Sequence, residues 1–299
     1  FLGHEHSPDE LLQNADIAMY QAKAAGRTTL RFFDAAMQKA ASARTERVSD
    51  LHRALEEREF LLYYQTQFNR NGVPIGAEAL VRWNHALRGM VSPAEFIPLA
   101  EETRLILPLG QWVLERACAQ LARWEDEPYK ADWTMSVNVS ALQFGQPDFV
   151  ACVLRALRQS GANPLNLKLE LTESMLVNDV QDVIAKMNAL KDHQVKFSLD
   201  DFGTGYSSLS YLKRLPLDQL KIDQSFVRDL LSDPNDAVIA QAIIALGHSL
   251  GLQVIAEGVE SMAQRDMLAS IDCDAFQGYY FAHPVAAADL AEATEEMGL

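Results

Sequence analysis

The chain has 299 residues, of which 48% are hydrophobic, and it carries a formal net charge of −15. It is long enough for one large domain, alone or with a small companion, and its composition is that of an ordinary soluble globular protein. The acidic charge disfavours broad binding to nucleic-acid polymers or anionic lipid, since both rely on a basic face. A small anionic ligand is compatible with this charge if metals or local cations bind it.

The cysteine usage and the apolar segments indicate the compartment. Cys118, Cys152 and Cys273 are odd in number and widely spaced, which favours a reduced, cytoplasmic compartment and buried, inert thiols. We expect no signal peptide at the N-terminus. Polar residues interrupt the most apolar helix, residues 237–250, as is typical of a core helix. We therefore expect no membrane contact from this segment, although upstream domains of the parent protein could carry an anchor.

Two segments precede the regular part of the chain. Residues 7–33 predict a helix and then a strand, because Pro8 and Asp9 favour a helix start and Gly26 favours a stop. This first unit is too small to fold alone. Residues 35–58 are rich in Ala, Glu and Arg, and this composition predicts a helical connector.

After Phe60, strand-like runs alternate with amphipathic helices. The expected strands are Phe60–Phe68, Ile75–Trp83, Trp133–Val139, Leu165–Leu171, Lys196–Asp201, Leu217–Asp223, Gln253–Glu257 and Ala275–Phe281. The expected helices are Leu107–Trp124, Phe149–Gln159, Val180–His193, Ser207–Leu215, Ala237–Leu250 and Met262–Ser270. This alternation predicts an α/β fold, a modified (β/α)8 TIM-like barrel. Only residues 69–74 join the first two strands, too few for a crossover helix, so those strands should be antiparallel.

The fifth expected strand ends in two adjacent carboxylates, Asp200 and Asp201, and then a glycine-rich turn. Neighbouring acids at the end of a buried strand repel each other and lose hydration, so they need cations or strong donors nearby. A divalent metal ion meets this need. Oxygen ligands favour Mg²⁺ or Mn²⁺ over zinc.

Other strands also carry polar groups toward the same end, where such barrels place their chemistry. These groups are Glu78, Asn138, Glu170, Asp200 with Asp201, Lys221 with Asp223, Glu257, and Gln277. Any one carboxylate could be a satisfied structural residue, but the set is hard to explain in that way. The first four groups could supply oxygens to one ion. Asp201 and Glu257 could share a second ion through Asp200.

Two neighbouring metal ions are the usual device for in-line displacement at a phosphate. Phosphodiester hydrolysis is therefore the expected reaction class, and the residues alone leave open which phosphoester is cleaved. Lys221 has two interpretations among these acids. It could compensate their charge, or it could contact the attacked phosphate or position the water.

The same residues carry a family resemblance. The motifs are Glu78-Ala79-Leu80-Val81-Arg82-Trp83, Asn138-Val139-Ser140, Glu170-Leu171-Thr172-Glu173-Ser174, the segment 200–208, Lys221-Ile222-Asp223, Glu257-Gly258-Val259-Glu260 and Gln277-Gly278. Over about Leu51 to Leu290 the chain resembles the EAL-domain family. That family comprises cyclic di-GMP phosphodiesterases on a modified (β/α)8 barrel with an antiparallel first strand. Several ordered motifs in their strand contexts are far more specific than one short match.

The resemblance implies hydrolysis of cyclic di-GMP to linear 5′-pGpG in bacterial second-messenger signalling, with two Mg²⁺ or Mn²⁺ ions per active site. The implied ligands are Glu78, Asn138, Glu170 and Asp200 for the first ion, and Asp200, Asp201 and Glu257 for the second. Glu257 would be a metal ligand, the general base, or both. Lys221 and Asp223 would assist the nucleophilic water. Calcium is expected to inhibit, because it tolerates irregular geometry.

The resemblance also implies substrate contacts and a regulatory loop. The implied contacts to substrate are Gln65, Leu80, Arg82 and Gln277. Glu173 would brace the loop that contains Phe202, Gly203, Thr204 and Gly205, and this loop would link the site to the interface of a homodimer. Glycines allow backbone angles that other residues resist, which favours a movable loop, with a rigid turn as the alternative.

Residues 1–34 resemble the end of a GGDEF domain. The resemblance rests on Asp9-Glu10-Leu11-Leu12, on residues 15–23 and on Gly26-Arg27, while the signature motif of that cyclase family is absent. We therefore expect no cyclase activity. The expected domains are a GGDEF-like remnant at 1–34, the connector at 35–58 and an EAL barrel at 59–299.

A binding module is the main alternative from another functional class. Some EAL relatives keep the pocket, lose catalytic acids and serve as cyclic di-GMP receptors. The acids are present in this chain, which favours the enzyme.

Overall fold

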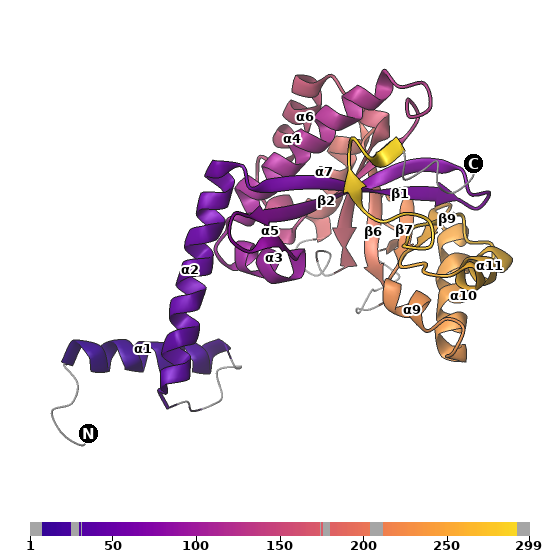
Figure 1. Cartoon of the computed structure of the whole chain (residues 1–299). Helices are drawn as coiled ribbons and strands as arrows, with labels where there is room; N and C mark the ends of the chain where they lie inside the picture. Colours follow the sequence, from indigo (N-terminus) through magenta and orange to yellow (C-terminus); the bar gives the residue numbers. More distant parts are fainter. Residues whose placement is uncertain are drawn as a thin grey trace. The chain divides into compact units, whose positions relative to one another are not determined.

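A computed structural model describes residues 8–24, 30, 32–173, 175, 180–203 and 212–291 (Figure 1). The chain separates into two compact units, Phe1–Arg58 and Glu59–Leu299. Among the helices in the described ranges, none has both the length and the apolar character needed to cross a membrane.

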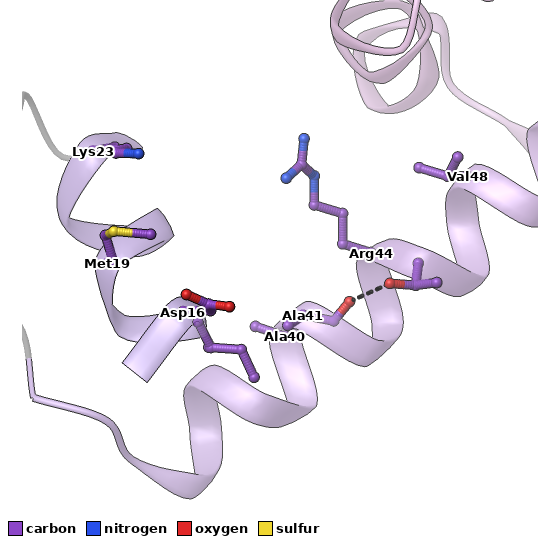
Figure 2. Close-up of a pocket in the computed structure, with 9 residues that line it drawn as sticks. Asp16, Met19, Lys23, Ala40, Ala41, Arg44 and Val48 are labelled. Atoms are coloured by element: carbon purple, nitrogen blue, oxygen red, sulfur yellow. Dashed lines mark hydrogen bonds between the residues drawn. The ribbon is translucent and has the colours of Figure 1, made fainter. Parts of the chain in front are cut away.

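The first unit contains two helices that contact each other, α1 (Pro8–Ala24) and α2 (Ala35–Glu57). The Asp34 carboxylate caps α2 by accepting the N–H of Met37, as is usual at a helix start. A hollow of about 600 Å³ lies between the helices, and Figure 2 shows residues that line it. The strand expected before Phe33 falls partly outside the described residues, and Leu30, Phe32 and Phe33 themselves form no strand.

The second unit is a closed barrel of eight strands. They are β1 (Phe60–Asn69), β2 (Pro74–His85), β4 (Thr134–Asn138), β5 (Leu167–Thr172), β6 (Lys196–Phe202), β7 (Gln219–Ile222), β8 (Gln253–Ala256) and β9 (Ala275–Phe276). The barrel closes because β1 pairs with both β2 and β9. Strand β1 is antiparallel to both neighbours, and the other adjacent pairs are parallel. The predicted fold class and the antiparallel first strand are confirmed.

The turn between β1 and β2 explains that antiparallel pairing. The Asn69 side chain accepts the N–H groups of Asn71 and Val73. Gly72 takes a φ of 80°, which is open to glycine and strained for most other residues. The chain therefore reverses within a few residues, and β2 pairs directly with β1 along its length.

Helices lie outside the barrel strands (Figure 1). They are α3 (Pro93–Glu102), α4 (Ile106–Glu125), α5 (Ala141–Phe144), α6 (Phe149–Ser160), α7 (Val180–Lys191), α9 (Gln224–Arg228), α10 (Pro234–Ser249) and α11 (Met262–Ser270), with a 3-10 turn at Pro164–Asn166. Short strands β3 (Gly89–Val91) and β10 (Val285–Ala286) extend the sheet beside β2 and β1. The helix expected at 207–215 lies mostly outside the described residues.

Buried thiols are confirmed at two of the three cysteines. Cys118 on α4 and Cys273 before β9 are buried, whereas Cys152 on α6 is partly exposed. Burial raises the pKa of both buried thiols to about 12, which keeps them protonated and unreactive at neutral pH.

Candidate active site

The barrel interior near the carboxyl ends of its strands is lined by polar side chains instead of the usual apolar layer. Asn138 on β4 lies directly opposite Glu170 on β5, and Thr172 lies opposite Asp200 on β6. Glu170 and Thr172 are two positions apart on β5, so they face the same side of the sheet. Strand register therefore brings residues that are far apart in the sequence to one end of the barrel.

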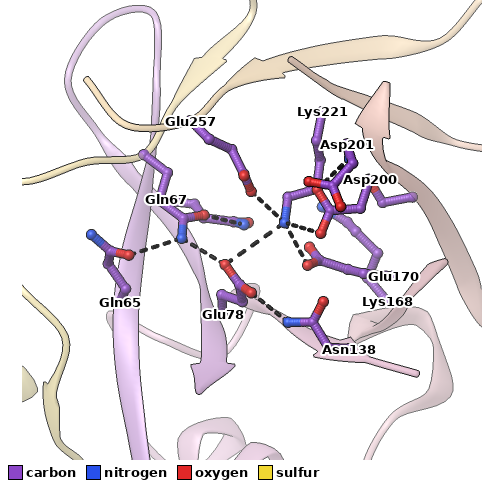
Figure 3. Close-up of polar contacts among 12 residues, drawn as sticks. Gln65, Gln67, Glu78, Asn138, Lys168, Glu170, Asp200, Asp201, Lys221 and Glu257 are labelled. Atoms are coloured by element: carbon purple, nitrogen blue, oxygen red, sulfur yellow. Dashed lines mark hydrogen bonds and ion pairs between the residues drawn. The ribbon is translucent and has the colours of Figure 1, made fainter. Parts of the chain in front are cut away.

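Lys221 lies at the centre of a group of four carboxylates (Figure 3). Its Nζ is 2.6 Å from Glu170 Oε2, 3.3 Å from Asp200 Oδ2 and 3.7 Å from Glu78 Oε2, and it also contacts Glu257 Oε1. The Lys221 side chain is 1% exposed. A buried ammonium is expensive unless acids surround it, and here four carboxylates do so.

Charge and burial oppose each other at this cluster. Burial lowers the pKa of Lys221, but the carboxylates around it outweigh that effect and hold the pKa well above its ordinary value. Burial raises the pKa of Glu170 to about 7, with neighbouring acids adding to the rise and Lys221 opposing it. Burial also raises the pKa of Glu257 well above its usual range. Lys221 therefore stays charged, while burial disfavours the charged form of Glu257.

The adjacent pair Asp200 and Asp201 follows a different geometry from the rest of β6. Asp201 has a φ of 54°, and its backbone N–H donates to Asp200 Oδ1 over 2.9 Å. The Asp200 carboxylate at this turn contacts Lys221. Burial, and then the charges of Asp200 and Asp223, raise the pKa of Asp201 to about 6.

Glu78 is held from two sides. Asn138 Nδ2 donates to its Oε1, and Gln277 Nε2 donates to its Oε2 over 2.7 Å. The Asn138 amide must therefore direct its Oδ1 away from Glu78, where an oxygen can serve as a ligand. Gln277 also donates to Gln65 Oε1, which places four of the expected site residues in one hydrogen-bonded group.

The donor set suits a hard divalent cation such as Mg²⁺ or Mn²⁺, because every candidate ligand atom is oxygen. Glu170 Oε1 is buried and finds no hydrogen-bond partner within the described ranges, as expected of an atom that can accept a cation. In this structure the acids converge on the Lys221 ammonium, and no three acidic, histidine or cysteine side chains of the described part form a ready metal cluster. The oxygen atoms of these side chains suit a divalent ion. In this structure the Lys221 ammonium supplies the positive charge among them.

Two hollows lie at this end of the barrel. One of about 260 Å³ is lined by Lys221, Glu257 and Tyr279, together with the expected contacts Gln65, Glu78, Leu80, Asp200 and Gln277. A second of about 320 Å³ lies against α3 and α4, has mainly apolar walls, and is lined by Leu80, Arg82 and Asn138 among others. Leu80 lines both.

Other expected residues have no direct contact with Lys221 within the described part of the chain. Asp223 caps α9 by accepting the N–H and hydroxyl of Ser225. Both carboxyl oxygens of Glu173 are buried without a hydrogen-bond partner among the described residues. Phe202 is buried and Gly203 has a φ of 100°. Thr204 and Gly205 lie outside the described residues.

Sequence reasoning missed a second set of polar residues inside the barrel. Gln67 donates to Gln277 Oε1 over 2.9 Å, and Lys168 donates to Gln219 Oε1 over 2.9 Å. Burial lowers the pKa of Lys168 to about 8. The available signal was alternation, because Gln67 is two residues from Gln65 and Lys168 is two residues from Glu170, so each pair shares a face of its strand.

The fold and the site together define a (β/α)8-type barrel with an acidic, oxygen-rich centre at the carboxyl ends of its strands. Residues 48–284 match the protein family described as EAL domain. The chain belongs to the EAL-domain family.

Individual relatives agree with this assignment. The chain is 44% identical over 289 residues to the bifunctional diguanylate cyclase/cyclic di-GMP phosphodiesterase MucR of Pseudomonas aeruginosa, covering 96% of this chain and 42% of that protein. It is 40% identical over 285 residues to the cyclic di-GMP phosphodiesterase NbdA of the same organism, covering 95% of this chain and 36% of the relative. The chain thus spans less than half the length of these relatives.

A solved structure described as "PaMucR Phosphodiesterase, c-di-GMP complex" matches with a TM-score of 0.80 and 45% identity. The match covers 82% of this chain and 99% of that one. The similarity therefore extends over the whole of a barrel that was solved with its ligand.

Proposed function

We propose that the chain hydrolyses cyclic di-GMP to linear 5′-pGpG, opening one phosphodiester bond of the ring with water. The observation that carries the proposal is the group of four carboxylates gathered around Lys221 at the mouth of an EAL barrel. The similarity to a barrel solved with c-di-GMP, and to relatives named as phosphodiesterases, supports the substrate.

The proposed metal ligands are the expected ones, Glu78, Asn138, Glu170, Asp200, Asp201 and Glu257. When bound there, two Mg²⁺ or Mn²⁺ ions would activate water and neutralise charge on the attacked phosphate. Lys221 would have to move from the centre of the acids when the ions bind. Its ammonium is suited to donate to a phosphate oxygen or to the water.

Glu257 is the proposed acceptor of the proton from water. It lines the 260 Å³ hollow and contacts Lys221. Burial raises its pKa, which makes its carboxylate a stronger base than an exposed glutamate. Asp223 would support the same water from the carboxyl end of β7. Glu257 could combine this role with metal ligation.

The two hollows suit a ligand with more than one bulky group. The 260 Å³ hollow is lined by some of the acids and suits a phosphodiester, whereas the 320 Å³ hollow has mainly apolar walls that suit a flat base. Arg82 lines the second hollow, and its guanidinium is suited to a phosphate oxygen. Gln65, Leu80 and Gln277 are proposed to contact the same ligand.

We also propose features that concern the protein as a whole. Residues 1–34 would be the remnant of a GGDEF-like domain and 35–58 a connector. An alignment covering 96% of the chain with a relative named as a bifunctional cyclase and phosphodiesterase supports this reading. The barrel would form a homodimer in the cytoplasm, with Glu173 and residues 202–205 linking the interface to the site. Sedimentation of the purified protein tests the dimer.

The test of the activity is Glu257→Ala, assayed with cyclic di-GMP and Mn²⁺ by chromatography of the linear product. We expect loss of turnover by at least about 100-fold, since the proton acceptor is removed. Glu115→Ala, at an exposed position of α4, is the matched control and should keep full activity. Normal turnover by Glu257→Ala would refute the assignment.

The receptor alternative gives a different result in the same assay. A receptor would bind cyclic di-GMP in the presence of metal and yield no linear product at any concentration of the wild-type protein. Calcium is expected to support binding without turnover, because its higher and irregular coordination suits a ligand complex better than in-line attack.

A further inference from the structure

A row of buried amides crosses the barrel beside the acids (Figure 3). Gln65 Nε2 donates to the backbone carbonyl of Ala282 over 3.0 Å, and Gln277 Nε2 donates to Gln65 Oε1 over 3.0 Å. Gln277 Nε2 also donates to Glu78 Oε2, and Gln67 Nε2 donates to Gln277 Oε1. All of these side chains are buried, and Gln67 is 0% exposed.

The chemistry of the partners fixes the direction of every amide in this row. A backbone carbonyl only accepts, so Gln65 must present its NH₂ group to Ala282 and its oxygen to Gln277. Gln277 must then present its NH₂ group to Gln65 and Glu78, which leaves its oxygen facing Gln67. Gln67 is therefore the donor that matches this end of the row.

Folding alone does not explain a glutamine at position 67. Its Oε1 is buried and has no hydrogen-bond partner in the described part of the chain. A buried, unpaired amide oxygen lowers the free energy of unfolding, so an apolar side chain of similar size would suit the core better. The one hydrogen bond that Gln67 makes is directed at Gln277.

We propose that Gln67 is a positioning residue that holds the Gln277 amide in the orientation that orients Glu78 as a metal ligand. Gln67 would not touch metal or substrate. It would prevent Gln277 from turning its oxygen toward the Glu78 carboxylate, a change that would replace an attractive contact by repulsion between two oxygens. The inference rests on the proposed function for the role of Glu78, and it concerns the metal site whatever phosphoester is cleaved.

The test is a titration of metal-free protein with Mn²⁺ in the absence of cyclic di-GMP. Binding is measured as the loss of the free-ion signal in electron paramagnetic resonance. We expect Gln67→Leu to lower the Mn²⁺ affinity of the site that contains Glu78 about 10-fold, within the range for residues that orient metal ligands. Gln67→Glu should lower it at least as much, because the new carboxylate cannot donate and would favour the flipped Gln277 amide.

A double-mutant cycle with Gln277→Leu separates positioning from a general structural effect. If Gln67 acts through Gln277, Gln67→Leu should cause no further loss of Mn²⁺ affinity in the Gln277→Leu background. Gln264→Met is the matched control, since Gln264 is a buried amide of α11 outside the barrel, and this variant should bind Mn²⁺ as the wild type does. If Gln67→Leu does not fold, Gln67→Met gives the same comparison.

Two results would overturn the inference. One is wild-type Mn²⁺ affinity in folded Gln67→Leu, and the other is a loss in the double variant equal to the product of the two single losses. Because cyclic di-GMP is absent from these titrations, a wrong substrate assignment would appear only in the product assay and would leave the Mn²⁺ comparison interpretable.

Discussion

At the scale of single residues, the most unusual feature is an ammonium group enclosed by acids inside a barrel. Lys221 and Glu170 are 1% and 0% exposed at their side chains, so water screens their interaction very little. The attraction between the two charges offsets the free-energy cost of burying each of them. The same arrangement predicts that the folded state depends on cations, because removing Lys221 leaves several carboxylates close together without a counter-charge.

We therefore expect Lys221→Met to lower the free energy of unfolding by about 3–5 kcal/mol in EDTA, the cost of breaking a buried ion pair. Millimolar Mn²⁺ should restore part of that loss, because the ion replaces the missing positive charge. Urea unfolding in EDTA and in Mn²⁺ measures both. Arg70→Met, which breaks the exposed 3.0 Å ion pair with Asp272, is the control and should cost less than about 1 kcal/mol. Equal stability of Lys221→Met and wild type in EDTA would contradict this account.

Much of the site could be predicted from residue type and position, and the remainder could not. Glu78, Asn138, Glu170 and Asp200 were recognisable because each is a polar residue in or after an apolar strand. Gln67 was not, because an uncharged amide in a strand is common and its importance depends on a partner 210 positions away. The central position of Lys221 depends on strand register as well, which the sequence does not state.

At the scale of elements, the alternating pattern predicts the eight barrel strands and most of the long helices. It fails for short elements such as β3, α5 and β10, which span too few residues to show a period. It also fails for α3, where a proline lies inside the helix. A proline in a helix interior removes a backbone donor, so sequence alone argues against a helix there.

Close packing between α10 and β8 gives a prediction at this scale. A Cβ atom on Gly247 would lie 2.4 Å from Val254 Cγ2. Val254 is fully buried and β-branched, so it cannot easily move away. We expect Gly247→Ala to lower the free energy of unfolding by about 1–3 kcal/mol, as overpacking does.

Thermal or urea unfolding measures this effect, with Gly247→Ala/Val254→Ala as the informative second variant. The double variant should be more stable than the sum of the two single losses predicts, because the smaller side chain leaves room for the new methyl group. Strictly additive losses would show that the close approach of α10 to β8 is not the cause.

At the scale of the whole molecule, closure of the barrel and the net charge of −15 act together. Closure brings acids from β2, β5, β6 and the end of β8 to one place, which raises the local negative potential above that of the surface in general. A molecule with this negative charge weakly attracts every cation in solution, and these cations screen its surface charges. A specific divalent site must therefore be distinguished from that general effect.

We expect Mn²⁺ at about 100 times its dissociation constant to raise the free energy of unfolding by about 2.7 kcal/mol, because an ion that binds only the folded state stabilises it by mass action. The melting temperature measured by calorimetry should rise by several degrees, and Ca²⁺ should raise it as well. Sodium chloride at matched ionic strength should give a much smaller rise, since screening acts on all exposed charges alike. Glu170→Gln should lose most of the Mn²⁺ effect and keep the sodium effect. Equal shifts with Mn²⁺ and with sodium at the same ionic strength would mean that the acidic centre binds no specific ion.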